Sequence, residues 1–283
     1  MIRPGILKKK KNQEIAVNVV AIVICTAFLL PVIIMIGASF KTENEIFQNA
    51  GQIFSYHPTL ENFKDIFSGN YSVGRSFVNS FLVALFSMLI STVIAVPAAY
   101  SMARFKVKGH SIMMLIFFVS QMLPPTLTLA PLFIMFNAMG ITNTLTAPIL
   151  ASTSSSIPFA ILTLRTYFVT VPDGLEDAAL IDGCSNFKAF LKIMCPITYP
   201  GICVTAVFCF VFGWNDLIYA MTFISDYSKW PATAGMFNFM NEYGLEWNMI
   251  MSYATLLILP VVCLFILLQN YMVEGLTGGA VKG

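Results

Sequence analysis

Six long apolar runs constrain this chain more than any other feature of its sequence. They cover residues 15–37, 77–102, 112–139, 145–168, 201–225 and 249–272. A helix needs about 20 consecutive apolar residues to cross the hydrocarbon core of a bilayer. Hydrophobic residues make up 57% of the chain and charged residues 11%, whereas a soluble domain carries about a quarter charged residues. The sequence therefore predicts an all-α integral membrane protein with six transmembrane helices.

The amino terminus carries Arg3 and the run Lys8–Lys11 ahead of the first apolar run. A basic segment before an apolar run also starts a signal peptide. This run is too long for the apolar part of a signal peptide, and it lacks a small-x-small cleavage site. We therefore predict a cytoplasmic basic tail over residues 1–14, followed by a single transmembrane domain over residues 15–283.

Lysine and arginine are distributed unequally between the loops. If the six runs cross the membrane in alternation, twelve of the 16 basic residues lie on the side of the amino terminus. Cytoplasmic loops carry the excess of lysine and arginine. We therefore expect both termini, the loop 169–200 and the tail 273–283 to be cytoplasmic, and the loops 39–74 and 226–248 to be extracytoplasmic. This arrangement places the protein in the cell membrane as a multi-pass chain.

The sequence lacks the motifs of several other protein classes. The net charge of +2 is too small to suggest nucleic acid as a partner, and no Cys-x-x-Cys pair suggests a zinc site or a disulfide framework. His57 and His110 fall on opposite sides of the predicted membrane, so they do not form a joint metal or catalytic site. No phosphate-binding loop and no hydrolase motif is present. We expect no enzymatic activity and no cofactor bound by this chain.

The loop 169–200 has the pattern of two short helices. Asp173 followed by Glu176 is a capping-box pattern, and Gly183 supplies a helix stop. A helical spacing of three or four residues predicts one shared face for Leu175, Ala178, Ala179 and Asp182. The second helix is expected to begin after Ser185, to carry the stripe Phe187, Phe190, Leu191 and Met194, and to end before Pro196.

This loop resembles the cytoplasmic EAA loop of ATP-binding-cassette importer permeases. The family pattern is Glu-Ala-Ala, three residues, Gly, nine residues and Ile-x-Leu-Pro, which matches Asp177-Ala178-Ala179, Gly183 and Ile193-Met194-Cys195-Pro196. Asp177 stands for Glu and Cys195 for Leu. Since Glu176 lies one residue earlier, the sequence leaves open which carboxylate has the acidic role.

Further segments extend the resemblance to most of the chain. Residues 99–105, 133–144, 214–216 and 278–283 are similar to segments of the inner-membrane permeases of the maltose-transporter type. This resemblance implies the type I importer fold, a second related permease, two cytoplasmic ATPases that hold ATP and Mg²⁺, and an extracytoplasmic solute-binding protein. It also implies a sugar or sugar-like solute, in particular an oligosaccharide, without identifying it or showing which permease contacts it most. The residues implied to couple the permease to the ATPases are Glu176, Asp177, Ala178, Ala179, Asp182, Gly183 and Pro196.

Polar residues inside the apolar runs are candidates for the solute path. Gln121 lies beside the helix-breaking pair Pro124-Pro125, and Ser154 lies in a run of five hydroxyl residues, 152–156. Trp214, Asn215 and Asp216 fall inside the fifth run. The alternative is that the hydroxyls serve helix packing and that Asp216 accepts hydrogen bonds from a neighbouring helix.

Two other classes remain open from the residues alone, a secondary carrier driven by an ion gradient and a membrane scaffold. An ion-coupled carrier generally needs ionisable relays near the membrane midplane. Only Asp216 lies deep within an apolar run, because Arg165, the one basic residue inside a run, falls at the cytoplasmic end of the fourth run. An ATP-driven importer permease is therefore the favoured function.

Overall fold

A computed structural model describes residues 4–49, 51–68, 73–105, 108–241 and 244–277. The chain forms two compact units. The first unit comprises residues 1–69 and 238–256, and the second comprises residues 70–237 and 257–283. Because the two units are not placed relative to each other, each is described separately.

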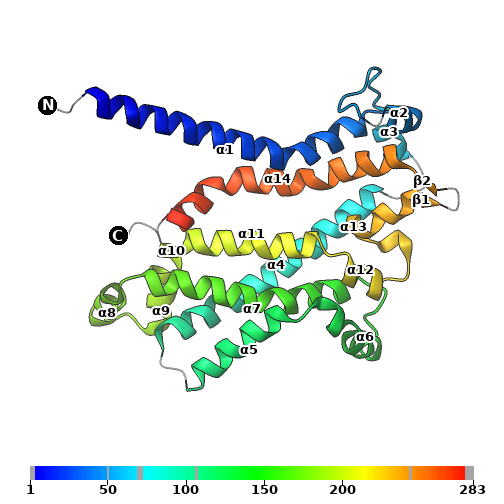
Figure 1. The fold of residues 1–283 in the computed structure, drawn as a ribbon. Helices are drawn as coiled ribbons and strands as arrows, with labels where there is room; N and C mark the ends of the chain where they lie inside the picture. Colours follow the sequence, from blue (N-terminus) through cyan, green and yellow to red (C-terminus); the bar gives the residue numbers. More distant parts are fainter. Residues whose placement is uncertain (1–3, 50, 69–72, 106–107, 242–243, 278–283) are drawn as a thin grey trace. The chain divides into compact units, whose positions relative to one another are not determined.

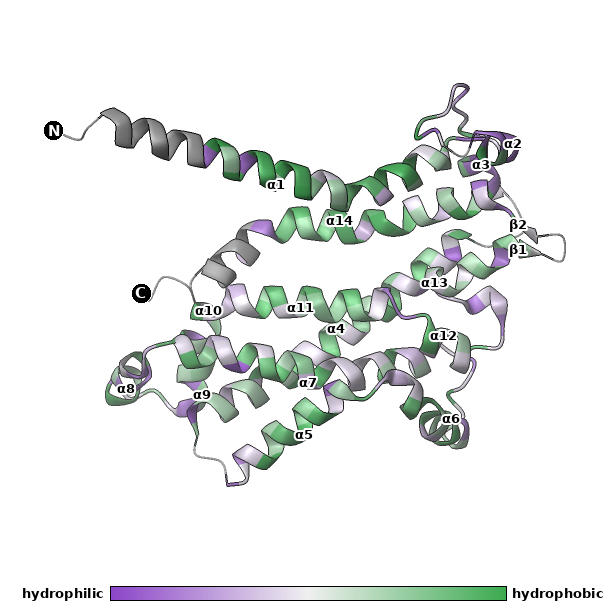
Figure 2. Cartoon of the chain, viewed as in Figure 1, coloured by the Kyte–Doolittle hydropathy of each residue, from purple (hydrophilic) through white to green (hydrophobic). Residues whose placement is uncertain are grey.

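Four helices of the described residues are long and apolar enough to cross a membrane. They are α1 (Pro4–Ser39), α4 (Val73–Arg104), α7 (Thr146–Thr170) and α14 (Trp247–Thr277), and their apolar colouring is visible in Figure 2. Two sharply bent helix pairs raise the number of candidate spans among the described residues to as many as six when each pair counts as one span. The prediction of an all-α membrane fold is confirmed. Helix α1 begins within the predicted basic tail, and α14 runs to Thr277, while residues 278–283 of the predicted tail lie outside the described residues.

The third apolar run is broken where the sequence predicts a break. Helix α5 (His110–Met122) ends before Pro124, which has an extended backbone and precedes the 3₁₀ turn η1 (Pro125–Thr128). Helix α6 (Leu129–Ala138) follows, and the two parts meet at 102°. Two adjacent prolines remove two backbone donors, so a straight helix cannot continue through them.

The fifth apolar run does not form the single helix expected over residues 201–225. Helix α11 (Tyr199–Trp214) ends early, and α12 (Ile218–Phe223) starts after a three-residue break. The reason is Asp216, whose two carboxylate oxygens accept hydrogen bonds from the backbone N–H groups of Tyr219 and Ala220, each at 3.1 Å. A carboxylate that satisfies these donors starts a new helix, in the manner of an N-cap.

Helices α4, α7 and α11 lie side by side and form the core of the second unit (Figure 1). Small residues of α4 and α7 are completely buried in this unit, namely Ala84, Ala95, Ala99, Ala147, Ala151 and Ala160. Two buried hydroxyls join these helices, with 2.7 Å between the Oγ atoms of Ser91 and Ser156. Ser152 and Thr153 are also buried, so these three members of the 152–156 run lie in the packed interior rather than at a solute path.

The remaining elements of the second unit lie at the ends of this core. At the end where α4 finishes, the chain forms α8 (Asp173–Ile181), α9 (Asn186–Ala189), a π-helical turn η2 (Phe190–Met194) and α10 (Cys195–Ile197). A bend of 77° separates this group from α11. At the other end are α12, η3 (Tyr227–Lys229) and α13 (Ala232–Gly235). A 3₁₀ turn, η4 (Met236–Phe239), then leads out of this unit.

The first unit is held by polar contacts around Asn62, which is 4% exposed. This residue lies in α3 (Glu61–Ser68), and its amide donates to the carbonyls of Ser39 and Lys41 at 2.9 and 2.8 Å. Its oxygen accepts a hydrogen bond from Asn248 at 2.9 Å. These bonds connect α3 to the end of α1 and the start of α14. The unit also contains α2 (Glu43–Gln48) and an antiparallel pair of short strands, β1 (Met240–Asn241) and β2 (Gly244–Leu245).

Gly213 permits the close approach of α11 to α4, which yields the first prediction. A Cβ atom at Gly213 would lie 2.9 Å from the Cα atom of Ala84, whereas a Cβ atom at Gly74 of α4 would meet no atom within 4 Å. Overpacking of this kind costs about 1–3 kcal/mol. We expect Gly213→Leu to lower the thermal unfolding midpoint of the detergent-solubilised protein and Gly74→Leu to leave it nearly unchanged. Equal midpoints for the two variants would contradict this account of the α4–α11 contact.

Candidate functional site

The segment between α7 and α11 forms the predicted pair of short helices. Gly183 follows α8 with a φ of +84°, a left-handed conformation that glycine adopts without strain. A side chain at Gly183 would meet no atom within 4 Å, so the requirement for glycine there is conformational only. Ser185 caps α9 by accepting a hydrogen bond from the Lys188 N–H at 3.4 Å, as predicted. We call residues 171–198 the coupling loop.

Two details of the coupling loop differ from the prediction. The expected capping box is wrong, because Pro172 occupies the N-cap position and Asp173 is already the first residue of α8. The expected end of the second helix before Pro196 is also wrong. The π turn η2 leads directly into α10, which contains Pro196 at its start, where the missing N–H of proline costs least.

The predicted shared face of α8 is divided in the structure. Glu176 and Ala179 are buried, at 9% and 5% exposure, and point into the protein. Asp177, Ala178 and Asp182 are exposed. Since successive residues of a helix are rotated by about 100°, the neighbouring carboxylates Glu176 and Asp177 face different surroundings. Glu176 lies 3.3 Å from the guanidinium Nε of Arg104 of α4, while Asp177 faces outward.

The outer surface of the coupling loop exposes large apolar side chains. Ile181 is 85% exposed and Phe187 is 68% exposed, and three leucines on the same loop are at least partly open: Leu175, Leu180 and Leu191. Several exposed large apolar side chains on one polar segment are typical of a protein or membrane contact. Together with the small side chain of Ala178, this surface has the character of a docking face.

The structure brings one of the predicted solute-path residues, Gln121, into contact with α7. The amide of Gln121 donates to the carbonyl of Ser155 at 3.2 Å. The hydroxyl of Ser155 lies 2.7 Å from that of Tyr219. Ser154 is exposed, and its hydroxyl donates to the carbonyl of Ala151. Ser155 is therefore a further candidate for the solute path. The sequence could not distinguish it from the other hydroxyl residues of the run, because they differ in burial and not in residue type.

Trp214 does not occupy the position expected for a sugar-stacking residue. It is 2% exposed, its ring is stacked on that of Phe210 with 5.9 Å between centroids, and its Nε1 donates to the carbonyl of Leu257. That expectation is wrong for this conformation, because both faces of the ring lie in the packed core. Asp216 uses both oxygens to start α12, so the structure favours the hydrogen-bonding alternative for it. Asn215 is exposed at the break between α11 and α12.

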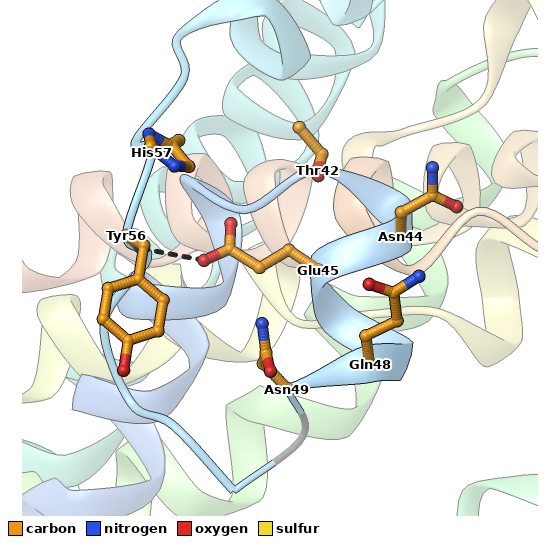
Figure 3. Close-up of a pocket in the computed structure, with 7 residues that line it drawn as sticks. All are labelled: Thr42, Asn44, Glu45, Gln48, Asn49, Tyr56 and His57. Carbon is orange, nitrogen blue, oxygen red and sulfur yellow. Dashed lines mark hydrogen bonds between the residues drawn. The ribbon is translucent and has the colours of Figure 1, made fainter.

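The first unit carries a polar pocket of about 490 Å³ (Figure 3). Glu45 lies at its centre and accepts hydrogen bonds from the Ser55 hydroxyl at 2.6 Å and from the Tyr56 N–H at 2.8 Å. These bonds lower the pKa of the Glu45 carboxyl below its ordinary value. The other lining residues are Thr42, Asn44, Gln48, Asn49, Tyr56 and His57. Among the described residues no group of three metal-ligating side chains occurs, so His57 is not part of such a cluster.

Comparisons with known proteins agree with this geometry. Residues 91–277 match the family described as binding-protein-dependent transport system inner membrane component. The sulfoquinovosyl glycerol transport system permease protein SmoH of Agrobacterium fabrum is 32% identical over 90% of this chain and 89% of its own length. The diacetylchitobiose uptake system permease protein DasC of Streptomyces coelicolor is 29% identical over 98% of this chain and 100% of its own.

A solved structure supports the fold independently. A chain of a bacterial ABC transporter involved in the import of the acidic polysaccharide alginate superposes with a TM-score of 0.76 at 17% identity, covering 93% of this chain and 97% of that one. The type I importer permease fold expected from the sequence is therefore confirmed. With its family match across the coupling loop and the core helices, this chain belongs to the inner membrane components of binding-protein-dependent transport systems.

Proposed function

We propose that this chain is the permease subunit of an ATP-driven importer of sugars, with an oligosaccharide or a sugar glycoside as the solute. The observation that carries the proposal is the coupling loop, whose exposed apolar face lies within a chain of the permease family. The similarity to permeases named for diacetylchitobiose and sulfoquinovosyl glycerol supports the substrate class. The partners are a second permease, two cytoplasmic ATPases and an extracytoplasmic solute-binding protein.

The ATP that drives uptake is bound by partner subunits and not by this chain. The chain has no phosphate-binding loop, so ATP and Mg²⁺ are held by the ATPase subunits. When the ATPases close on ATP, they move the coupling loop. Helices α7 and α11 follow directly, because they are continuous in sequence with the loop. The movement of these helices opens the solute path to the binding protein.

The exposures in α8 divide the roles of the two adjacent carboxylates. Asp177 is exposed beside Ala178 and therefore has the acidic role toward the ATPase. Glu176 is buried and paired with Arg104, so it holds α8 to the permease itself. Asp182 and Pro196 lie on the exposed surface of the loop, and Gly183 sets the turn between its two helices.

The solute path uses exposed polar groups near the two helix breaks. Gln121, Ser154 and Ser155 lie together on α5 and α7, and Asn215 lies at the break after α11. Amide and hydroxyl groups both donate and accept hydrogen bonds, which suits the hydroxyls of a neutral sugar. Irregular backbone at membrane depth is tolerated where it faces protein or a water-filled cavity, so the break at Asn215 fits such a path.

The functional assignment predicts the energy source of uptake. We expect proteoliposomes with this permease, its partner permease and the ATPases to accumulate a labelled oligosaccharide only with ATP inside and binding protein outside. Ionophores should leave uptake unchanged. Uptake that persists without ATP and stops with an ionophore would instead identify an ion-coupled carrier. In the same assay we expect Asn215→Ala to lower uptake several-fold while ATPase activity persists, with Asn137→Ala, an exposed amide on α6, as the control.

The docking assignment predicts the effect of a charge on the exposed face of α8. Ala178→Arg places a long cation on the surface proposed to meet the ATPase. We expect the ATPases to be lost from the purified complex and uptake to fall at least about tenfold, while the permease still inserts into the membrane. Ala178→Ser retains a small side chain and should behave as the unchanged chain does. Normal co-purification and uptake with Ala178→Arg would exclude this face from the contact.

The orientation is tested by labelling single cysteines from outside the cell. In a chain whose six native cysteines are replaced, His57→Cys should react with an impermeant maleimide in intact cells. Lys188→Cys, on the exposed part of the coupling loop, should react only in inverted vesicles. The reverse pattern would place the coupling loop outside and disprove the proposed topology.

A further inference from the structure

Of the three core helices, only α4 is not directly connected in sequence to the coupling loop. Helix α7 enters the loop at Val171, and α11 leaves it after Thr198, so both are joined to the loop by the chain itself. The end of α4 at Arg104 is 67 residues away from Val171 in the sequence. A movement of the loop therefore reaches α4 through contacts between side chains.

Two residues of α4, one helical turn apart, make polar contacts with the coupling loop. The hydroxyl of Tyr100 donates to Oε1 of Glu176. The guanidinium of Arg104 forms ion pairs with Glu176, at 3.3 Å from Nε to Oε2, and with Asp173. It also donates to the carbonyl of Val171 at 2.6 Å. Oε1 of Glu176 thus contacts Tyr100, and Oε2 contacts Arg104.

The ring of Tyr100 extends this contact to the second half of the loop. Its centroid lies 4.7 Å from that of Phe190 in η2 and 5.7 Å from that of Phe168 in α7. Phe190 and Met194 of the loop are buried in the same apolar cluster as Tyr100. Tyr100 therefore contacts α8 through its hydroxyl and η2 through its ring.

The two ion pairs of Arg104 differ in burial and therefore in strength. The side chains of Arg104 and Glu176 are 9% and 12% exposed, whereas that of Asp173 is 84% exposed. An exposed ion pair is screened by water and contributes little. Removing one partner of a buried pair leaves an uncompensated charge and is strongly unfavourable. The contact of Glu176 with Tyr100 and Arg104 is therefore the connection that resists separation.

We propose that Tyr100 and Arg104 are positioning residues that hold Glu176 of the coupling loop and make the end of α4 move together with α8. The proposal rests on the proposed function, because it assigns the route by which ATPase movement reaches α4. Together, the residues Tyr100, Arg104 and Glu176 form what we call the α4 clamp. Since α4 packs on both α7 and α11, a loop that moves without α4 would have to break this core.

The first experiment separates coupling from stability. In the assembled transporter, ATP hydrolysis and sugar uptake are measured in parallel for Tyr100→Phe, which keeps the ring and removes only the hydroxyl, and for the pair Arg104→Gln with Glu176→Gln, which leaves no unpaired buried charge. We expect both to assemble and hydrolyse ATP, and the amount of sugar imported per ATP to fall at least about fivefold. Asp173→Asn alters the exposed pair and should keep the normal ratio.

The outcomes distinguish this proposal from the proposed function. If the unchanged transporter shows no uptake driven by ATP and binding protein, the proposed function fails. If it transports, and Tyr100→Phe and the double variant import as much sugar per ATP as the unchanged chain, the clamp has no role in coupling and the proposal is overturned.

A second experiment applies if these variants do not assemble, because it leaves the clamp unchanged. Spin labels at Ser101→Cys in α4 and at Gly174→Cys in α8, where a side chain would meet no atom within 4 Å, report the distance between the two elements in a chain without native cysteines. We expect this distance to be the same before and after ATP is trapped on the ATPases. A change of about 5 Å, the size of a one-turn shift between packed elements, would show that α4 and α8 move separately and would overturn the proposal.

Discussion

The close packing of α4 against α7 and α11 is the contact on which the rest of the second unit depends. In a membrane the hydrophobic effect does not drive helices together, because lipid tails are as apolar as the side chains. Buried alanines on α4 and α7 and Gly213 on α11 let the backbones approach, and the hydroxyls of Ser91 and Ser156 bond between α4 and α7. The resulting three-helix core can transmit a movement from one of its ends to the other.

The coupling loop has one side that contacts this core and one side that is exposed to a partner in the proposed function. Its inner side is anchored, through Glu176 to α4 and through Phe190 to the apolar cluster, while its outer side presents Ala178, Asp177 and Ile181. A helix of nine residues can separate these tasks because adjacent side chains point in different directions. In the proposed function, one face binds the ATPase while the other holds the loop to the permease.

The two helix breaks provide polar groups for the proposed passage of a polar solute. A continuous membrane helix satisfies its own backbone and offers few polar groups. The break at Pro124-Pro125 follows Gln121, and the break after Trp214 exposes Asn215 while Asp216 restarts the helix. The same residues that interrupt the helices thus leave hydrogen-bonding groups close to the proposed path.

The sequence by itself determined the membrane class, the break at Pro124-Pro125, the turn at Gly183 and the cap at Ser185, because hydropathy and local backbone chemistry act over a few neighbouring residues. The tertiary structure alone decided which polar residues are buried. It placed Trp214 in the core and kept Ser154 and Ser155 apart from the buried Ser152, Thr153 and Ser156. It also separated Glu176 from Asp177, since the partners of Glu176 are Tyr100 and Arg104, more than 70 residues away in the chain. Burial depends on such distant partners, and no local pattern encodes them.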